Sequence, residues 1–489
     1  MRILLVSALA LIVLTGVLLL RANTYFPDRQ LYGMEPVPMP EVDADAMAAR
    51  LAGSIRIPTI SHDDRSNFDA QAFLDFHDYL AQHYPAVHRA ATRQIINDYS
   101  LVFRLEGADP SLKPALFMGH MDVVPVDPAT ADQWTHPPFS GAIEEGVVWG
   151  RGAIDDKLTV MALMEAMEML LAAGKTPQRT VYFAFGHDEE VGGNDGAGQV
   201  AQFFRDQGIS FEFVLDEGGV VTEGMIAGIE PPVAIIGIAE KGYMNLHLTV
   251  DAPGGHSSQP PPHTAAGILA QAIVKVEENP FPTDLSAMDA NFEYLGHYFP
   301  LPTRLALANT WLLGPAVEQV MLSSPVSAAS IRTTTAVTML EGSSKSNILP
   351  TRAVAVVNFR VLPGDTVEGV RQHIVAAIDD DRVDVSVHMA NEPSPVSSTE
   401  SFGFGLLEKT IRGMDDRVLV APYLVQGGTD AKHFVDLSDS VYRFMMYRAD
   451  AETTKRVHGV DEQVAIYDYA EAVRFYYALP NNLGEPAAG

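Results

Sequence analysis

Hydrophobic and polar positions along the chain follow two alternating patterns, one typical of helices and the other of strands. Apolar residues recur at helical spacing in residues 43–51, 67–83 and 158–173. Short apolar runs that are typical of buried strands lie at residues 101–105, 115–118, 180–185 and 211–215. Because strands that alternate with helices form parallel sheets covered on both faces, we predict an α/β domain with a mainly parallel sheet.

The pattern changes between residues 240 and 392. There the runs predict a strand, a helix, a proline-interrupted insert at 280–325, two strands, a helix and a final strand. Without the insert this order is β-α-β-β-α-β, which is typical of a ferredoxin-like α+β sandwich. We therefore expect residues 240–392 to form a second domain, inserted into an α/β domain made of residues 41–239 and 393–489.

The N-terminus carries an almost unbroken apolar run at residues 3–20, between Arg2 and Arg21. This run is just long enough to cross a bilayer as a helix. No small-residue cleavage site follows it, so we favour an uncleaved anchor over a removed signal peptide at residues 1–21, followed by a tether at 22–40. We expect the body to be extracytoplasmic (periplasmic, lumenal or secreted), and the alternative is a body that faces the cytoplasm.

Composition narrows the possible partners and chemistries. A chain of 489 residues can build two or more full-sized cores. Its formal net charge of -29 argues against nucleic acid or an anionic membrane surface as a partner, because phosphate would be repelled. The chain contains no cysteine, which excludes disulfides, thiol catalysis and cysteine ligands. Any metal must therefore be held by His, Asp and Glu.

The stretch Phe-Ala-Phe-Gly-His-Asp-Glu-Glu-Val-Gly-Gly at residues 183–193 is the strongest candidate for chemistry. It predicts a buried strand that ends in the acids Asp188, Glu189 and Glu190. Ligands bind at the carboxyl ends of parallel strands, so adjacent carboxylates there could hold a metal and move a proton. The alternative is a solvated acidic turn that serves only solubility.

A histidine and a pair of acids follow other predicted elements. His120 comes directly after a strand, and Asp122 could orient its imidazole because alternate residues of an extended segment point the same way. A satisfied histidine at the end of a strand is the alternative. Asp155 follows a glycine-containing turn and could bridge two cations, whereas Asp156 is a good N-cap for the next helix.

Two further stretches are weak when taken alone. Asp216 ends another apolar strand, and His458 precedes the last predicted helix. Asp461 and Glu462 could cap and charge the first turn of that helix, which would leave His458 as an ordinary loop residue. Only the collective pattern, with each group at a strand end or a helix start, favours one site.

Together these stretches resemble the ordered motif set of the di-zinc metallopeptidases related to aminoacylase. The motifs are Gly-His-Met-Asp-Val-Val-Pro, Gly-Arg-Gly-Ala-Ile-Asp-Asp-Lys, Gly-His-Asp-Glu-Glu-Val-Gly-Gly, Asp-Glu-Gly-Gly, Gly-Gly-His-Ser-Ser, Ser-Asn-Ile-Leu-Pro, Gly-Gly-Thr-Asp and His-Gly-Val-Asp-Glu. They are most similar to the branch with the vacuolar carboxypeptidase S (Gly-Xaa carboxypeptidase) and the secreted N-fatty-acyl-amino-acid hydrolases. The resemblance covers nearly all of the chain after residue 40.

The resemblance implies two zinc ions per chain, with other divalent metals possible, and hydrolysis of an N-acyl amino acid or short peptide. The implied ligands are His120, Asp216, Asp155, Glu190 and His458. The first three would hold one zinc and the last three the other, so that Asp155 bridges them. Glu189 would be the general base and acid, Asp122 would support His120, and the peptide bond after Asp155 would be cis.

The resemblance also implies that the inserted domain acts as a lid and a dimerisation domain. His256 would stabilise the oxyanion at the site of the other subunit of a homodimer. Asn347 and Arg360 would contact the carboxylate end of the substrate. Lys432 stands where relatives often have arginine. Its ammonium could bind a carboxylate at best as a point charge, whereas the guanidinium of arginine would bind it through two parallel hydrogen bonds. The alternative is a non-catalytic binding or scaffold protein that keeps the fold.

The insert at 280–325 is rich in aromatic residues. These are Phe281, Phe292, Tyr294, Tyr298, Phe299 and Trp311. They offer enough apolar surface to roof a pocket for an acyl chain. The alternative is that they pack only the insert itself, since aromatic residues dominate cores generally.

Overall fold

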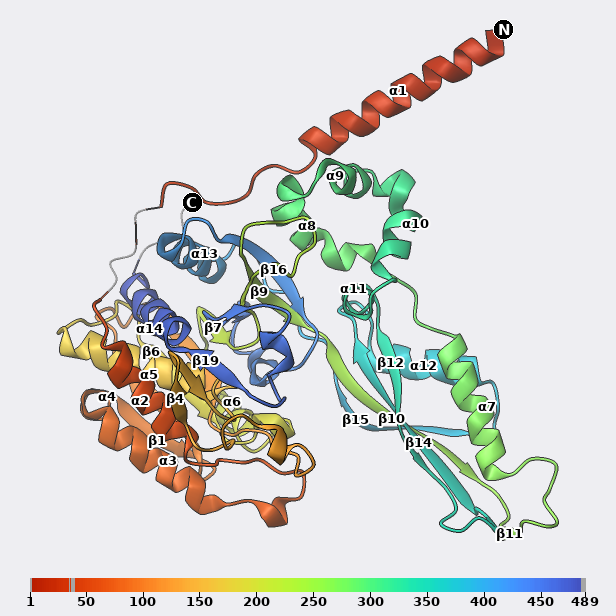
Figure 1. Cartoon of the computed structure of the whole chain (residues 1–489), viewed down its shortest axis with the longest axis horizontal. Coiled ribbons are helices and arrows are strands. Elements are labelled where there is room, and N and C mark those ends of the chain that lie inside the picture. Colours follow the sequence, from red (N-terminus) through yellow and green to blue (C-terminus); the bar gives the residue numbers. More distant parts are fainter. Residues whose placement is uncertain (1, 35, 37–39, 485–489) are drawn as a thin grey trace.

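The computed structural model describes residues 2–34, 36 and 40–484. Figure 1 shows a large α/β domain, a smaller α+β domain beside it and the helix α1 (Arg2–Thr24), which projects away from both. Among the described residues, α1 is the one helix that is long and apolar enough to cross a membrane. The anchor, tether and C-terminal segments expected from the sequence each extend into residues outside this description.

The large domain is built on a sheet with the strand order β1-β2-β6-β3-β7-β17-β9-β8-β18, in which β16 also pairs with β9. The strands are β1 (Thr92–Ile96), β2 (Ser100–Leu105), β3 (Ala115–His120), β6 (Val181–Gly186), β7 (Phe213–Asp216), β8 (Val221–Thr222), β9 (Val233–Glu240), β16 (Leu419–Val425), β17 (Val441–Arg443) and β18 (Arg448–Ala449). At the centre, β3 runs parallel to β6 and β7, and β7 runs parallel to β17. The predicted mainly parallel sheet is thus confirmed, with antiparallel strands such as β1 and β2 at one edge.

Helices cover both faces of this sheet, as predicted. One face packs on α2 (Ala44–Ile55), α3 (Ala70–His83), α4 (Pro85–Ala90), α5 (Lys157–Ala172), α13 (Phe402–Met414) and α14 (Ile466–Asn481). The other face packs on α6 (Ala197–Asp206) and the short helix η6 (Asp430–Phe434). Side chains alternate between the faces along β3, since Phe117 belongs to the first core while Leu116 and Met118 belong to the second.

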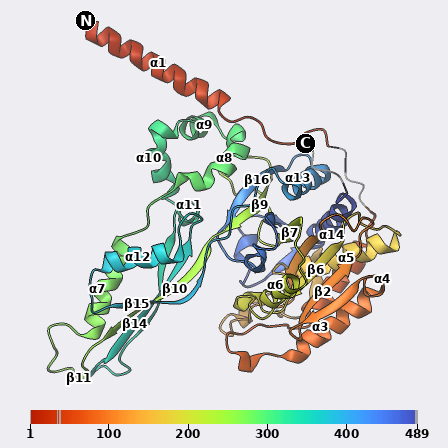
Figure 2. The ribbon, with the colours of Figure 1, turned by 180° about the vertical axis from the view of Figure 1, so that it is seen from behind.

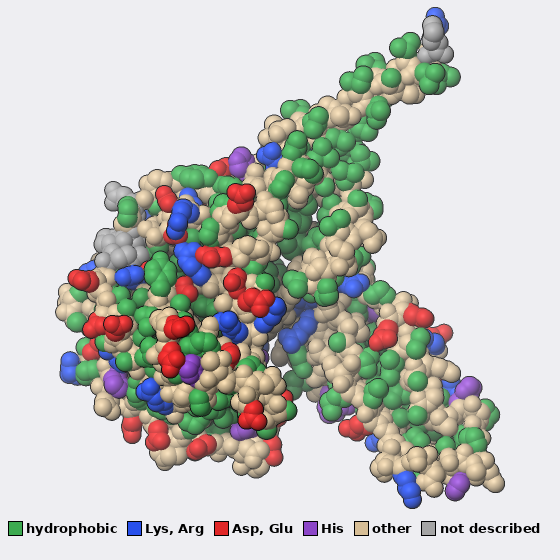
Figure 3. Space-filling model, viewed as in Figure 1, with side chains coloured by type: hydrophobic (Ala, Val, Ile, Leu, Met, Phe, Trp, Pro, Cys, Tyr) green, Lys and Arg blue, Asp and Glu red, His purple; other side chains and the backbone are tan. Residues whose placement is uncertain are grey.

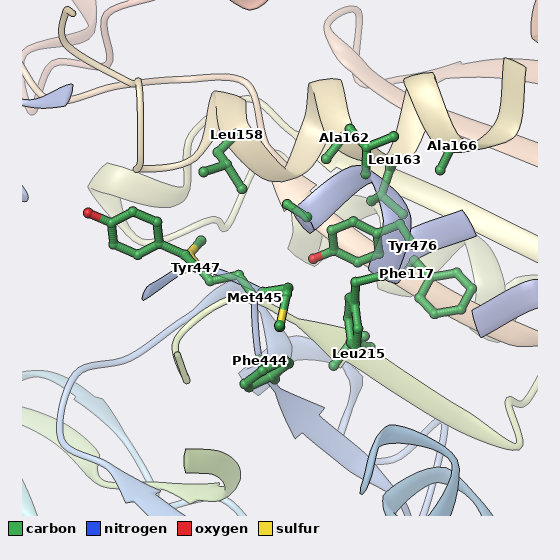
Figure 4. Packing of buried hydrophobic residues seen from close by; sticks show 14 of the residues in the cluster. Phe117, Leu158, Ala162, Leu163, Ala166, Leu215, Phe444, Met445, Tyr447 and Tyr476 are labelled. Atoms are coloured by element: carbon green, nitrogen blue, oxygen red, sulfur yellow. The ribbon is translucent and has the colours of Figure 1, made fainter. Parts of the chain in front are cut away.

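The helix α5 lies at the centre of the first core. Figure 4 shows Leu163 of α5 close to Tyr476 of α14, with Phe117 and Leu215 of the sheet beside Tyr476, whereas Leu158 lies farther along α5. These five side chains are buried to within 2% of full burial. Burial of each such side chain stabilises the fold by about 1.5–3 kcal/mol, so the N-terminus of α5 is held firmly at the sheet edge.

A small sheet joins the last part of the chain to the loop before α5. It contains β4 (Ala142–Glu144), β5 (Val147–Trp149) and β19 (Gln463–Ala465). β19 pairs with β5, and the backbone N–H of Gly150 donates to the carbonyl of Glu462 at 2.8 Å. Segments that are about three hundred residues apart in sequence therefore meet beside the first turn of α5.

The smaller domain has the predicted β-α-β-β-α-β order. Its elements are β10 (Gly242–Asp251), α7 (Ala265–Glu278), β12 (Thr334–Glu341), β14 (Arg352–Val361), α12 (Val367–Ile378) and β15 (Asp384–Asn391). The sheet order is β12-β14-β10-β15 and all its pairs are antiparallel. Alternate residues of β10 and β14 are buried, and they form one core with α7 and α12. A two-stranded ribbon of β11 (Gly255–His256) and β13 (Ile348–Leu349) ends this domain far from the large sheet (Figures 1 and 2).

The proline-interrupted insert between α7 and β12 is mostly helical. It contains η4 (Leu285–Met288), α8 (Asp289–Leu295), η5 (Gly296–Tyr298), α9 (Leu301–Leu307), α10 (Thr310–Met321) and α11 (Pro325–Ser330). Its aromatic residues do not gather over one pocket. Phe281 packs on Phe359 in the small domain, and Tyr294 packs on Phe404 in the large domain. Trp311 is 60% exposed, so the expectation of an aromatic roof is not supported.

Candidate active site

The ends of three parallel strands meet at one edge of the large sheet. His120 is the last residue of β3, the short helix η3 (Glu189–Val191) follows β6, and Glu217 follows β7. In the sheet, β3 lies between β6 and β7. Because ligands bind at the carboxyl ends of parallel strands, these residues stand where the fold places a site.

Asp155 lies between two imidazoles. Its Oδ1 is 2.9 Å from Nε2 of His120, and its Oδ2 is 3.0 Å from Nε2 of His458. Nε2 of His458 is also 3.1 Å from Oε2 of Glu190. The peptide bond between Asp155 and Asp156 is cis. A single carboxylate therefore connects a histidine of the sheet with a histidine near the C-terminus.

Buried Glu462 holds the loop that carries Asp155. Its Oε1 accepts hydrogen bonds from the backbone N–H groups of Ile154 and Asp155, at 2.9 and 3.1 Å. Its Oε2 lies 2.6 Å from Nη1 of Arg151, which is also buried. The interpretation of Glu462 as a charge on the first turn of the last helix is wrong, because α14 begins at Ile466 and this carboxylate faces the loop instead.

The loop that carries His458 is fixed at two points. Arg151 donates through Nη2 to the carbonyl of His458 at 3.1 Å. Asp461 accepts hydrogen bonds from the N–H and the hydroxyl of Thr135, at 2.7 and 2.8 Å, and so it does not cap α14. His458 has a φ of 59°, in the left-handed region that non-glycine residues seldom adopt. These contacts present the imidazole to Glu190.

Asp122 contacts both His120 and the acidic loop. Nδ1 of His120 lies 3.0 Å from the backbone carbonyl oxygen of Asp122 and 3.3 Å from its Oδ1, so that Nε2 is left to face Asp155. The backbone N–H groups of Glu189 and Glu190 donate to the two oxygens of Asp122, at 3.2 and 3.1 Å. The buried carboxylate is thus placed to orient the imidazole and to hold η3 at the same time.

Glu217, rather than Asp216, points toward the cluster. Asp216 continues the pleat of β7 on the side of Val214, where its Oδ2 accepts a hydrogen bond from the N–H of Ala431 at 2.7 Å. Oε1 of Glu217 lies 3.7 Å from Nε2 of His120. Glu217 thus faces the cluster while Asp216 faces η6, as strand alternation beyond the end of β7 indicates, and the ligand role expected for Asp216 stays a prediction.

Asp156 also differs from its expected role. It occupies the N-cap position of α5, but its side chain makes no capping hydrogen bond. Instead its Oδ2 accepts a hydrogen bond from the backbone N–H of His120 at 3.3 Å. Its Oδ1 is buried and has no hydrogen-bond partner among the described residues. Asp156 thus faces the site rather than the helix end.

The concentration of buried acids shifts the pKa of several groups. Burial and neighbouring carboxylates raise the pKa of Glu189 well above its usual value. Hydrogen bonds to Asp155 and Glu190 raise the pKa of His458 to about 10. Burial opposes the charged form of His120, yet hydrogen bonds to two carboxylates raise its pKa well above the usual value. The cluster therefore attracts positive charge, either as protons or as a metal ion.

The donor atoms fit a metal centre. Among the residues that the structure describes, two groups have ligand atoms that lie within 4.8 Å of one another, namely His120 with Asp155 and Glu190, and His120 with Asp156 and Glu217. Imidazole nitrogens and carboxylate oxygens are the ligands that zinc takes when thiolates are lacking. Oε1 of Glu190 is buried without a hydrogen-bond partner among the described residues, which leaves a lone pair for a cation.

The expected substrate contacts are divided between the two domains. His256 is exposed in the ribbon at the far end of the small domain, where Ser258 donates to its Nδ1 from the hydroxyl at 2.8 Å. Asn347 lies beside it, because its carbonyl accepts from the N–H of Ser257 at 3.3 Å. The structure thus does not bring these two residues to the metal cluster of their own chain.

The two expected cationic contacts lie elsewhere. Arg360 is half-buried on β14, and its guanidinium carbon is 4.9 Å from the centre of the Tyr243 ring. Lys432 is half-buried in η6, on the part of the chain that also contacts Asp216. Neither cation belongs to the cluster around Asp155.

A parallel-centred sheet with a His-carboxylate cluster at its strand ends, together with an inserted ferredoxin-like domain, defines a metal-dependent hydrolase. The chain belongs to the family described as Peptidase family M20/M25/M40, which matches residues 116–482. It is an enzyme of this metallopeptidase and amidohydrolase family.

Curated relatives and solved structures agree with this assignment. A probable carboxypeptidase S-like 2 of Dictyostelium discoideum is 42% identical over 441 residues, which cover 89% of this chain and 85% of the relative. The human N-fatty-acyl-amino acid synthase/hydrolase PM20D1 is 37% identical over 444 residues, covering 89% of this chain and 88% of the relative. The crystal structure of an M20 family metallo-carboxypeptidase from Sulfolobus solfataricus superposes with a TM-score of 0.64 at 18% identity, covering 89% of this chain and 98% of that one.

Proposed function

We propose that this enzyme hydrolyses the amide bond of an N-acyl amino acid or a short peptide and releases a free amino acid. The observation that carries the proposal is the single carboxylate of Asp155, which connects His120 and His458 beside the acidic loop of Glu189 and Glu190. The names of the relatives, carboxypeptidase S-like and N-fatty-acyl-amino acid synthase/hydrolase, support this substrate class.

Two divalent cations, with zinc favoured by the donor set, would share Asp155. His120 and Glu217 would complete one ligand set, while Glu190 and His458 would complete the other. Glu217 replaces Asp216 in this assignment because of its direction. Bound zinc would supply polarisation of the scissile carbonyl and a lower pKa for the attacking water.

Glu189 would move the proton. Its backbone N–H is held by Asp122, and burial beside other carboxylates raises its pKa well above the usual value, as is common for a general acid–base residue. Glu189 would accept the proton of the attacking water and then deliver it to the nitrogen of the leaving amine. Asp122 would hold this loop and the His120 imidazole in place during both proton transfers.

His256 would act on the site of a second subunit in a homodimer. Its place at the far end of the small domain supports this, because a pairing of two chains can bring that end to the partner's cluster. There His256 of the partner subunit would steady the oxyanion of the tetrahedral intermediate. Asn347 lies beside His256 and would enter the same site.

The carboxylate of the released amino acid would be bound by cations. Arg360 and Lys432 are the proposed contacts, with Arg360 held over Tyr243 by a cation–π interaction. Lys432 offers a point charge rather than a fork of donors. We therefore expect a looser requirement for a terminal carboxylate than an arginine at this position would impose.

The helix α1 would anchor the enzyme in a membrane without being cleaved, with the body extracytoplasmic. Its length of 23 residues and the mean hydropathy of 3.0 over its most apolar 18 residues support this role. None of those 18 residues is buried against the rest of the protein. Its last turn nevertheless packs on α9, so the helix continues into the fold.

The direct test is a hydrolysis screen of the purified chain. N-acyl amino acids with short and long acyl chains should be cleaved with zinc supplied, and chelation should abolish the release of amino acid. Dipeptides form the comparison set. A chain that holds two metals yet cleaves none of these amides would contradict the proposed function.

The dimer is tested by mixing two inactive chains. A His256→Ala chain keeps Glu189, and a Glu189→Gln chain keeps His256, so a mixed dimer has one complete site. Substantial recovery of activity is expected on mixing, whereas each variant alone stays nearly inactive. No recovery despite measured subunit exchange would exclude the arrangement in trans.

A further inference from the structure

The helix α10 exposes its apolar side. The residues that recur on its outer face are Trp311, Leu312, Pro315, Ala316, Gln319 and Val320. Only one of them is polar and none is charged. Trp311 is 60% exposed and Val320 is 71% exposed, while Gly314 and Val317 face inward. A surface helix of a water-soluble domain presents its polar residues to water, so the apolar outer face of α10 indicates contact with an apolar surrounding.

This apolar helix is joined to the end of α1. The Nε of Arg21 donates to the carbonyl of Ala308 at 2.9 Å, and Nδ2 of Asn309 donates to the carbonyl of Leu18 at 3.2 Å. Ala22 of α1 is only 2% exposed. Asn309 directly precedes α10. The start of α10 is therefore held against the last turns of α1.

The contact with Leu18 sets the depth of α10. Leu18 lies inside the apolar run at residues 3–20 that would cross the bilayer, roughly 4–5 Å along the helix axis from Arg21 at its end. A residue bonded to Leu18 therefore stands at the boundary between the headgroups and the acyl chains. Both ribbon views place α9 and α10 at the base of α1, and Figure 3 shows hydrophobic side chains continuing from α1 onto this part of the insert.

We propose that the outer face of α10 is seated in the lipid bilayer beside α1, as a second and peripheral membrane contact of the enzyme. The occupant is lipid rather than protein, because the face continues the surface of the spanning helix at the depth where that helix leaves the acyl chains. Trp311 suits this depth, since tryptophan favours the interface. The uncharged face requires no anionic headgroup, which agrees with the net charge of -29.

This inference rests on the proposed role of α1 as a retained anchor. It predicts that the body does not swing freely on a tether but has one orientation on the membrane. The segment that follows α1 agrees with this prediction. Its residue Gln30 is buried and exchanges hydrogen bonds of 2.8 and 2.7 Å with the carbonyl and N–H of Val420. The chain at Gln30 is thus packed on β16.

The test uses the full chain in phosphatidylcholine vesicles. Because the chain contains no cysteine, Ala316→Cys places a unique thiol on the α10 face for a fluorescent label. Ile95→Cys is the matched control, since Ile95 is a 45% exposed apolar residue on β1. Lipids with a nitroxide on the acyl chain should quench the label at 316 several-fold more than the label at 95. A further change of Val320→Lys should reduce that quenching.

Each other outcome overturns the proposal in a distinguishable way. Equal, weak quenching at both positions in vesicle-bound protein would place α10 in water. Protection of the 316 label from aqueous iodide without quenching by lipid would show that a second copy or another protein covers the face. If the chain does not float with the vesicles at all, the role of α1 falls together with that of α10, while hydrolysis measured in detergent still tests the enzymatic proposal separately.

Discussion

Removal of the Glu462 carboxylate should weaken both the fold and the metal centre. Glu462 is fully buried, pairs with Arg151 at 2.6 Å and accepts the N–H groups of Ile154 and Asp155. In Glu462→Ala the guanidinium of Arg151 stays buried without its counter-charge. Breaking a buried pair in this way costs about 3–5 kcal/mol of unfolding free energy.

Two features of the structure bear on that range. Arg151 keeps two acceptors, the carbonyls of His458 and Gly459 at 3.1 and 3.0 Å, which lowers the cost. The two freed backbone N–H groups add to it by about 1–3 kcal/mol each if they find no water. In Glu462→Gln the side-chain carbonyl still accepts both N–H groups, so we expect a smaller loss of about 1–3 kcal/mol.

The same change should lower metal affinity, because Glu462 fixes the backbone of Asp155. Loss of such a supporting group typically costs 10–100-fold in metal affinity, and this is the range we expect. Urea unfolding followed by tryptophan fluorescence, with a competitive zinc titration of the folded protein, measures both effects. As a control, Glu368→Ala removes an exposed partner of Arg371 and should change neither quantity. A Glu462→Ala protein as stable as the wild type, with unchanged zinc affinity, would refute this reasoning.

Two further predictions concern single side chains. Glu217→Gln should lose one metal per chain on dialysis, as measured by elemental analysis. Asp216→Asn should retain both metals, because its amide oxygen can still accept the hydrogen bond from the N–H of Ala431. The opposite result would make Asp216 the ligand. Burial raises the pKa of Glu408 from its usual value of 4.5 to about 7, so its contribution to stability is present below pH 4.5 and is lost as the pH rises through 7. Glu408→Gln should therefore raise the free energy of unfolding at pH 8 by an amount on the order of 1–3 kcal/mol and leave it unchanged at pH 4.5. An equal change at both pH values, measured by urea unfolding, would contradict this assignment.

The order of elements could be predicted because it depends on local patterns. The runs in residues 240–392 indicate strands and helices within a few residues of where the structure has them, and their order is enough to name the ferredoxin-like sandwich. The placement of His120 at the end of β3 follows in the same way from the apolar run before it.

The finer features of the site depend on geometry that a pattern cannot specify. Asp216 and Glu217 are adjacent, and a single step along a strand reverses the direction of a side chain. The pair of Glu462 and Arg151 joins residues 311 positions apart, so no local pattern indicates it. For Asp156, helix capping and a bond to the N–H of His120 compete for one carboxylate, and the packing of α5 against β3 decides between them.

The most direct test of the account is the activity of Glu189→Gln measured together with its metal content. This change removes the proposed base and keeps the size of the side chain, and the backbone N–H of residue 189 still donates to Asp122. We predict about two zinc ions per chain and a fall in turnover of an N-acyl amino acid by a factor of about 10²–10⁴, the usual contribution of general acid–base catalysis. A variant that keeps both metals and cleaves the substrate at the wild-type rate would contradict the proposed mechanism.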